Sequence, residues 1–235
     1  MLTVIGGLKS AAGVTTCAMA WAYRHGATVV EADPAGGDVA GWWAWPDAGL
    51  SDLAATAVRH GRIGPEQVAA CTRVTRFGAS VVAAPLLPRG AARSVAEVVD
   101  VLPKAATDLD LVVDVGRVDP TAVTGRLLAE ADRVVLLVPP VAGELARLRV
   151  LLPELARVCG DRLSVVLSRA GQGGPPWFPV REVVATLGCP IAGVVPFDPR
   201  TAAVVAGWPG RLPGRGRLGR WARWRWPLLE AVTRW

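Results

Sequence analysis

The sequence predicts one doubly wound α/β domain, with a mostly parallel sheet of about seven strands flanked by helices. Short apolar runs rich in β-branched residues recur along the chain without polar alternation, which is typical of strands buried on both faces. Segments with helical spacing separate these runs, as parallel pairing of successive strands requires. Of the 235 residues, 51% are hydrophobic and 20% are charged, so the chain can bury a sizeable core and does not have a disordered composition.

Each expected strand is an apolar run of four to six residues. In chain order these strands are Leu2–Ile5, Thr28–Glu31, Ser80–Ala84, Leu109–Asp114, Arg133–Val138, Leu163–Leu167 and Ile191–Val195. The expected helices are the alanine-rich Thr15–His25, then Ala91–Leu109, Asp119–Ala131, Gly143–Val158 and Pro179–Leu187. Ser94, with Glu97 three residues later, is the expected cap of the second helix. Gly36–Gly49 breaks the alternation and is expected to form a loop or short helix beside a strand end.

The positive charge of the chain is concentrated at one end. The net charge is +6, and residues 211–235, with seven arginines and one acid, carry all of that excess. We therefore expect a neutral domain over residues 1–208 and a basic, Trp/Arg-rich tail over residues 209–235. The Gly/Pro/Arg-rich stretch Gly207–Gly219 is the expected linker. This distribution excludes a uniformly basic nucleic-acid coat and directs any anionic partner to the tail.

The cysteines, the histidines and the apolar segments favour a cytoplasmic protein. The four cysteines are scattered and both histidines are isolated, so we expect structural thiols and assign no histidine to a metal. No basic segment precedes the first apolar residues, and the longest uncharged run, Val183–Phe197, has 15 residues. A bilayer span needs roughly 18–20. We predict a cytoplasmic location and leave open a peripheral position on the inner face of the membrane.

The turn after the first strand carries the clearest chemical signal. Small residues and hydroxyls fill positions 6–16, where backbone N–H groups and a helix N-terminus can bind phosphate. A standard P-loop reads GxxxxGK[ST], whereas Gly13-Val14-Thr15 here takes the place of Gly-Lys-Thr. The turn predicts a phosphate site that lacks the usual lysine.

This turn resembles the loop of the MinD/ParA family of deviant P-loop ATPases, which reads Lys-Gly-Gly-x-Gly-Lys-[Ser/Thr]-[Ser/Thr]. The same eight positions here read Lys9-Ser10-Ala11-Ala12-Gly13-Val14-Thr15-Thr16. The leading lysine, the last glycine and both hydroxyls match, while two glycines and the inner lysine are replaced. The resemblance implies that these eight residues bind ATP or ADP. It also implies that Thr15 contacts Mg²⁺ and that Lys9 reaches the nucleotide of a dimer partner.

Other motifs extend the resemblance, in family order, over about residues 1–205. Glu31–Gly36 resembles the family's Asp-x-Asp-Pro-x-Gly stretch, which implies that Asp33 acts with Mg²⁺ and positions water, as a catalytic residue beside Lys9. Asp110–Gly116 resembles the Walker B strand, which implies that Asp114 is the second metal-side acid. Asp33 and Asp114 could instead cap neighbouring helices, and Lys9 could be a solvated loop cation.

The base of the nucleotide would lie near two later segments. Ser168-Arg169 stands where the family often has Asn-Arg, and Leu187–Asp198 resembles the family's Leu-Gly-x-Pro…Gly-x-Ile-Pro-x-Asp. The resemblance implies nucleotide contacts by Arg169, Pro196 and Asp198.

Val14 leaves three functional states open. The inner lysine normally holds the β- and γ-phosphates during transfer, and its loss should reduce hydrolysis sharply. The chain could be a slow ATPase, a nucleotide-binding switch without turnover, or a pseudo-enzyme without nucleotide.

Two tryptophan-rich segments are candidate contact surfaces. In the tail, Trp221, Trp224, Leu228, Val232 and Trp235 recur at helical spacing, with arginines on the other side and Pro227 as a break. This segment could close the domain, bind an anionic membrane, or bind DNA or another acidic partner. Trp42-Trp43-Ala44-Trp45 could be a protein-interaction patch or a plug over the sheet edge.

The resemblance favours a switch that forms a homodimer with nucleotide and positions a larger machine, in chromosome partition, at the division site, or in pilus or secretion assembly. The alternative is a non-catalytic scaffold on the same fold. A small-molecule kinase or a synthetase-like enzyme is a third alternative, which no substrate constellation supports.

Overall fold

The computed structural model describes residues 1–9, 13–47, 49–169 and 178–209, and within them an eight-stranded sheet forms the middle layer. Its strands are β1 (Leu2–Gly7), β2 (Thr28–Glu31), β3 (Arg73–Val74), β4 (Ser80–Val82), β5 (Leu111–Arg117), β6 (Arg133–Val138), β7 (Leu163–Ser168) and β8 (Ile191–Val195). The order across the sheet is β3-β4-β2-β5-β1-β6-β7-β8. Neighbouring strands are parallel, except that β3 pairs antiparallel with β4 at one edge. The predicted doubly wound α/β class is confirmed.

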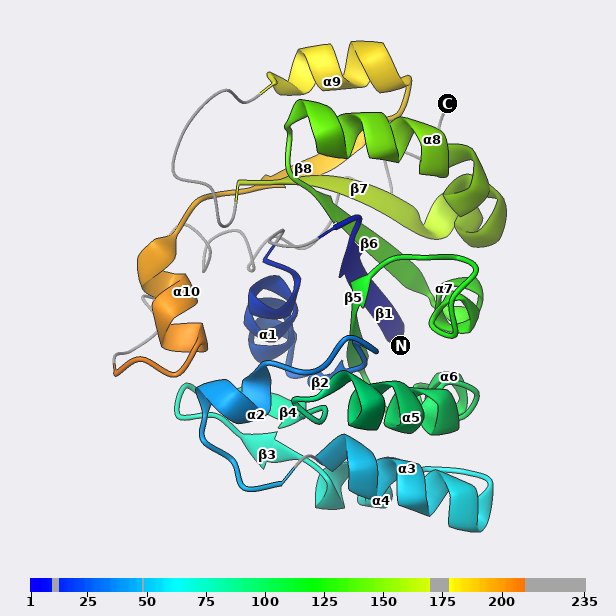
Figure 1. Cartoon of the computed structure of the whole chain (residues 1–235), viewed down its shortest axis with the longest axis vertical. Helices are drawn as coiled ribbons and strands as arrows, with labels where there is room; N and C mark the ends of the chain where they lie inside the picture. Colours follow the sequence, from blue (N-terminus) through cyan, green and yellow to red (C-terminus); the bar gives the residue numbers. More distant parts are fainter. Residues whose placement is uncertain (10–12, 48, 170–177, 210–235) are drawn as a thin grey trace.

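Helices cover both faces of this sheet (Figure 1). One face carries α1 (Val14–His25), α2 (Val39–Trp42) and α10 (Pro199–Val205). The other carries α3 (Gly49–His60), α4 (Pro65–Ala70), α5 (Pro88–Val98), α6 (Leu102–Ala105), α7 (Gly125–Glu130), α8 (Ala142–Cys159) and α9 (Val180–Leu187). The chain therefore has two hydrophobic cores, one on each side of the sheet.

Successive side chains along the central strands point to opposite faces of the sheet and so contribute to both cores. In β6, Val134, Leu136 and Val138 join the core under α5 to α8, while Val135 and Leu137 join the core under α1. A strand covered by helices on both faces must be apolar at every position, since successive side chains point to opposite faces. This is why the strand runs in the sequence lack polar alternation.

Two predicted helices are wrong in extent. The expected helix Ala91–Leu109 is two helices, α5 and α6, and Ser94 lies inside α5, whose N-cap is Leu87. Pro103 stands in the first turn of α6, where its missing N–H is tolerated. In the interior of one continuous helix the same proline would remove a hydrogen bond and clash with the preceding turn. The expected helix Asp119–Ala131 is helical only in α7, because Asp119 Oδ1 accepts hydrogen bonds from the N–H and the hydroxyl of Thr121 in a local turn.

The short edge strand β3 and the helices α3, α4 and α10 were not expected. Gly36–Gly49, expected as a loop or short helix, contains α2. Residues 210–235 lie outside the described residues, so the basic tail and its boundary stay predictions. Within the described ranges, no helix is long and apolar enough to cross a membrane.

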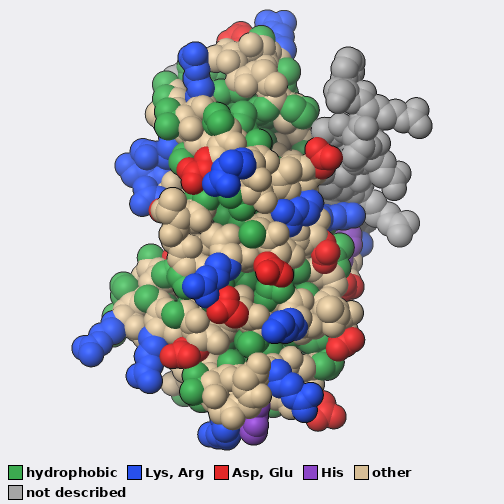
Figure 2. Space-filling model, turned by 90° about the vertical axis from the view of Figure 1, so that its right-hand side faces the viewer, with side chains coloured by type: hydrophobic (Ala, Val, Ile, Leu, Met, Phe, Trp, Pro, Cys, Tyr) green, Lys and Arg blue, Asp and Glu red, His purple; other side chains and the backbone are tan. Residues whose placement is uncertain are grey.

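The surface of the domain carries both signs of charge. Figure 2 shows basic and acidic side chains interspersed over the face it presents. This agrees with the balanced charge of the sequence before residue 211.

Truncating a fully buried strand residue tests the double-sided core. Leu136 on β6 is 0% exposed, so Leu136→Ala should lower the free energy of unfolding by about 2–5 kcal/mol in urea titrations. Val150 on α8 is 78% exposed, and Val150→Ala, the control, should change it by less than about 0.5 kcal/mol. Equal effects of the two substitutions would contradict the placement of β6.

Candidate functional site

The carboxyl ends of β1, β2 and β5 border a cavity of about 520 Å³. In an open parallel sheet this edge is where ligands bind. Of the residues predicted for the site, it is lined by Lys9, Gly13, Val14, Thr15, Thr16 and Asp33. Five further residues complete the lining: Ala35, Asp38, Trp42, Gly116 and Arg117. Ser10, Ala11 and Ala12 lie outside the described residues.

Gly13 sets the geometry of the turn that enters α1. Its φ of 74° places it in the left-handed region, which glycine adopts without steric cost, and it is the N-cap of the helix. The Cys17 N–H donates to the Gly13 carbonyl over 2.9 Å, which begins the helical ladder. The first turn of α1 thus opens onto the cavity with its N-terminal N–H groups, a ready site for an anion.

Asp114 on β5 is a buried carboxylate beside this turn. It is 1% exposed, its Oδ1 accepts a hydrogen bond from the Gly116 N–H over 2.9 Å, and its Oδ2 has no partner among the described residues. Burial raises the pKa of Asp114 to about 6. The neighbouring Thr15 hydroxyl and the Gly116 N–H act in the opposite direction and lower it. An unpaired buried carboxylate oxygen is costly unless something binds it.

Asp33 lies close to the end of β5 because position 116 is glycine. Gly116 has φ of 60°, and a Cβ there would overlap Asp33 Oδ2. The Oδ1 of Asp33 accepts a hydrogen bond from the Ala35 N–H over 2.8 Å. Burial raises the pKa of Asp33, and the charge of Asp38 adds to this, while the Ala35 N–H lowers it.

Thr15, Asp33 and Asp114 form a donor set suited to Mg²⁺ held together with phosphate. Mg²⁺ is usually bound through one or two carboxylates, several waters and substrate phosphates. Within the described ranges, no group of three or more His, Cys, Asp or Glu residues could hold a metal on its own. Two carboxylates and a hydroxyl, with the Asp114 oxygen unpaired, fit an ion that also takes ligands from a nucleotide.

The residues expected to contact the base lie apart from this cavity. Arg169 and Pro196 follow β7 and β8, and the Arg169 N–H donates to the Val195 carbonyl over 3.0 Å. Asp198 caps α10, where its carboxylate accepts the Thr201 N–H and, over 2.8 Å, the Thr201 hydroxyl. The three residues lie at neighbouring strand ends, two strands and more beyond β1 in the sheet.

Glu31, at the end of β2, organises the loop that carries Asp33 and Asp38. It is 1% exposed, and its carboxylate accepts the N–H groups of Asp38 (2.6 Å), Val39 (3.2 Å) and Ala84 (2.9 Å). A Cβ at Gly37 would overlap Glu31 Oε2. Burial raises the pKa of Glu31 to about 7, and the charge of Asp114 adds to this, while the three N–H groups lower it. The sequence offered one signal for this role: Glu31 is a charged residue at the end of an apolar strand, and Gly36 and Gly37 follow it closely.

The indoles after this loop are packed rather than free. Trp43 Nε1 donates to the Val205 carbonyl over 3.2 Å, and its ring lies 6.4 Å from Trp45 and 5.9 Å from Phe77. The three tryptophans are partly buried against the core under α1, and Trp42 also lines the cavity. This packing favours the plug over the interaction patch.

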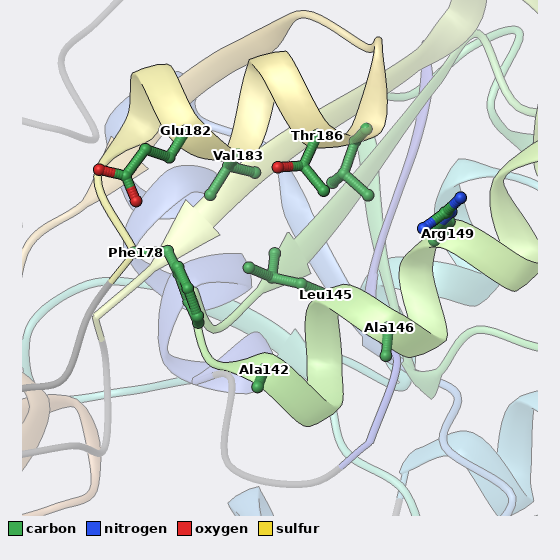
Figure 3. Close-up of a pocket in the computed structure, with 9 residues that line it drawn as sticks. Ala142, Leu145, Ala146, Arg149, Phe178, Glu182, Val183 and Thr186 are labelled. Atoms are coloured by element: carbon green, nitrogen blue, oxygen red, sulfur yellow. The ribbon is translucent and has the colours of Figure 1, made fainter.

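A second cavity, of about 300 Å³, lies between α8 and α9 on the opposite face from α1 (Figure 3). Its walls are mainly apolar, with Phe178 and Leu145 facing it beneath Val183. Among the described residues, its polar lining is limited to Arg149, Glu182 and Thr186, and no glycine turn at a helix N-terminus borders it as in the first cavity.

The pKa of Glu31 gives a testable dependence of stability on pH. The folded pKa, about 7, lies above the ordinary 4.5, so the folded state keeps the proton longer. The contribution of Glu31 to stability is therefore fully present below about pH 4.5 and is lost as the pH rises through about 7. The glutamine in Glu31→Gln cannot ionise. Between about pH 5 and 8 the free energy of unfolding of this variant should therefore decline less than that of the wild type, and the difference should be up to about 3 kcal/mol.

Urea titrations at several pH values measure this decline. Glu97→Gln, on exposed α5 surface, is the matched control and should keep the wild-type slope. A wild-type slope in Glu31→Gln would contradict the assignment.

Several solved structures share this fold. A ParA family ATPase from Chlorobium tepidum TLS superposes with a TM-score of 0.72 at 16% identity, covering 94% of this chain and 96% of that one. The septum site-determining protein MinD of Pyrococcus horikoshii, complexed with Mg-ADP, gives 0.69 at 14% identity, covering 100% and 97%. Cobyrinic acid a,c-diamide synthase from Mycobacterium smegmatis, with bound ATP analog and magnesium, gives 0.58 at 15% identity, covering 100% and 95%.

The chain thus has the MinD/ParA-like P-loop NTPase fold. At these identities the likeness establishes the fold alone. No protein-family model matches the sequence, and no curated protein does.

Proposed function

We propose that this chain is a MinD/ParA-like nucleotide-binding switch that positions or assembles a larger cellular machine, with weak or absent ATP hydrolysis. One observation carries the proposal. The left-handed Gly13 turn, the Thr15 hydroxyl and the Asp33 carboxylate meet at one cavity, and the buried Asp114 carboxylate, whose Oδ2 has no hydrogen-bond partner among the described residues, neighbours Thr15. Chromosome partition, the division site and pilus or secretion assembly are the candidate machines.

Each residue would have a distinct part in holding the nucleotide. The N-terminal N–H groups of α1 and the turn before it bind phosphate oxygens. Thr15, Asp33 and Asp114 hold Mg²⁺, which neutralises phosphate charge when bound. Lys9 is exposed at the cavity, where its side chain is available to a second copy of the chain. The base of the nucleotide would lie near Arg169, Pro196 and Asp198.

Val14 is the reason to propose a switch with little turnover. It lines the cavity at the position where a P-loop lysine would stabilise charge during phosphoryl transfer. The same residue supports the second candidate, a pseudo-ATPase scaffold that works through protein contacts alone. The two differ in whether nucleotide changes the oligomeric state.

We expect ATP–Mg²⁺, but not ADP–Mg²⁺, to convert the protein to a dimer in size-exclusion chromatography with light scattering. Isothermal titration should show binding of both nucleotides. Lys9→Ala should abolish dimerisation and leave binding by the monomer within about threefold, because Lys9 acts on the partner's nucleotide.

Lys104 offers a matched control, since it is the other of the two lysines and is exposed on α6. Lys104→Ala should behave as wild type. Nucleotide binding without any change of mass would favour the scaffold, and no binding at millimolar nucleotide would reject the switch.

Residues 211–235 lie outside the described residues, and we propose that they attach the domain to an anionic membrane surface. Seven arginines among tryptophans have the composition of an interfacial segment. The full chain should float with vesicles containing anionic lipid, and a chain ending at residue 209 should not. Binding to duplex DNA with a steep salt dependence, without flotation, would assign the tail to DNA. Loss of solubility on truncation would instead indicate packing on the domain.

A further inference from the structure

The cavity at the ends of β1, β2 and β5 has an excess of acid close to its phosphate-binding turn. Asp33 and Asp38 line it, and the carboxylates of Asp114 and Glu31 are buried close to these two residues. A polyphosphate in this place needs more positive charge than the backbone N–H groups supply. The position that would supply a lysine is Val14. Among the described residues that line the cavity, the cations are Lys9 and Arg117.

Arg117 is fixed to the backbone of the phosphate-binding turn. It is the last residue of β5, where it pairs with Gly7 of β1 after an irregularity in the register. Its Nε donates to the Leu8 carbonyl over 3.1 Å, directly before Lys9. Because Nε is engaged, the guanidinium is held at the turn.

The rest of the guanidinium has no partner in the described part of the chain. Neither Nη1 nor Nη2 donates a hydrogen bond to a described residue, and no described carboxylate lies within ion-pair distance. Asp119 is a competitor for this guanidinium, but its pKa is lowered first by the Thr121 hydroxyl, and the charge of Arg117 is the last of the causes that lower it. Asp119 Oδ1 already accepts two hydrogen bonds from Thr121. Both Nη groups can therefore bind a ligand in the cavity.

The topology of the sheet indicates which phosphate Arg117 would meet. Arg169 and Pro196, on the proposed base side, follow β7 and β8, while β5 lies on the other side of β1. A nucleotide with its base at β7 and β8 and its phosphates at the β1 turn points its last phosphate towards β5. Arg117 and Asp33 are the side chains at that end.

We propose that Arg117 binds the terminal phosphate of a nucleoside triphosphate and supplies the positive charge that a lysine at position 14 would supply in a standard P-loop. This rests on the proposed nucleotide function and names the residue that distinguishes triphosphate from diphosphate. The planar guanidinium suits this task, since two parallel N–H groups match two phosphate oxygens.

Isothermal titration with a non-hydrolysable ATP analogue and with ADP, both with Mg²⁺, tests the assignment. Arg117→Ala should weaken binding of the ATP analogue at least tenfold and change ADP binding less than threefold. Arg117→Lys keeps the charge and should lose less. In the double variant Val14→Lys/Arg117→Ala, a lysine at position 14 should recover most of the affinity for the ATP analogue.

Arg59→Ala, which removes one exposed arginine from the last turn of α3, controls for net charge and should bind as wild type. Thermal unfolding checks that each variant is folded. If Arg117→Ala is not folded, Arg117→Lys is used in its place. For Arg117→Lys alone, a loss for the ATP analogue that ADP does not share supports the assignment, and unchanged affinity overturns it.

The remaining outcomes separate the two proposals. If Arg117→Ala binds the ATP analogue as tightly as Arg59→Ala does, the assignment is overturned and nucleotide binding stands. Equal losses for both nucleotides would overturn the assignment to the terminal phosphate. If the wild-type chain binds neither nucleotide, the proposed function fails, and the role of Arg117 fails with it.

Discussion

The parallel pairing of β1 with β5 is the constraint on which the site depends. It places the turn after Gly7 beside Asp114 and Arg117, and the Val118 N–H extends the pairing by donating to the Gly7 carbonyl over 2.8 Å. A Cβ at Gly6 would overlap the Val118 side chain, so the glycine makes room for the side chains of the neighbouring segment. Residues more than a hundred positions apart thus share one cavity.

Buried acid is the energetic cost of this arrangement. Glu31, Asp33 and Asp114 all have raised pKa values with burial as the main cause. Ion pairs do not offset this cost, because those found among the described residues lie elsewhere, at Asp47, Asp100 and Asp110. Clustered, desolvated carboxylates at a sheet edge are a feature of functional sites, where a bound cation can stabilise them.

The elements that the sequence predicted well are those whose environment is uniform. The seven predicted strands lie between two layers of helices, and their mainly apolar runs identified them. Elements whose formation depends on neighbours were missed or misjudged. The exposed two-residue strand β3 exists only because β4 offers an edge, and Asp119 made a turn where helical spacing predicted a helix. Local propensity cannot anticipate these tertiary contacts.

By itself the sequence determined the fold class, the glycine turn that leads from β1 into α1, and the positions of the acids that follow β2 and lie on β5, because each depends on residue type at a strand end. Only the tertiary structure decided that Trp43 packs against Val205, that Glu31 holds the Asp38 loop, and that Arg117 is tied to Leu8. Two of these contacts, those of Trp43 and Arg117, join segments more than a hundred residues apart, and in all three the partner is a backbone group, which every residue carries. The side-chain pattern marked Glu31 as an unusual charged residue in a buried strand, but it could not specify which backbone groups these side chains contact.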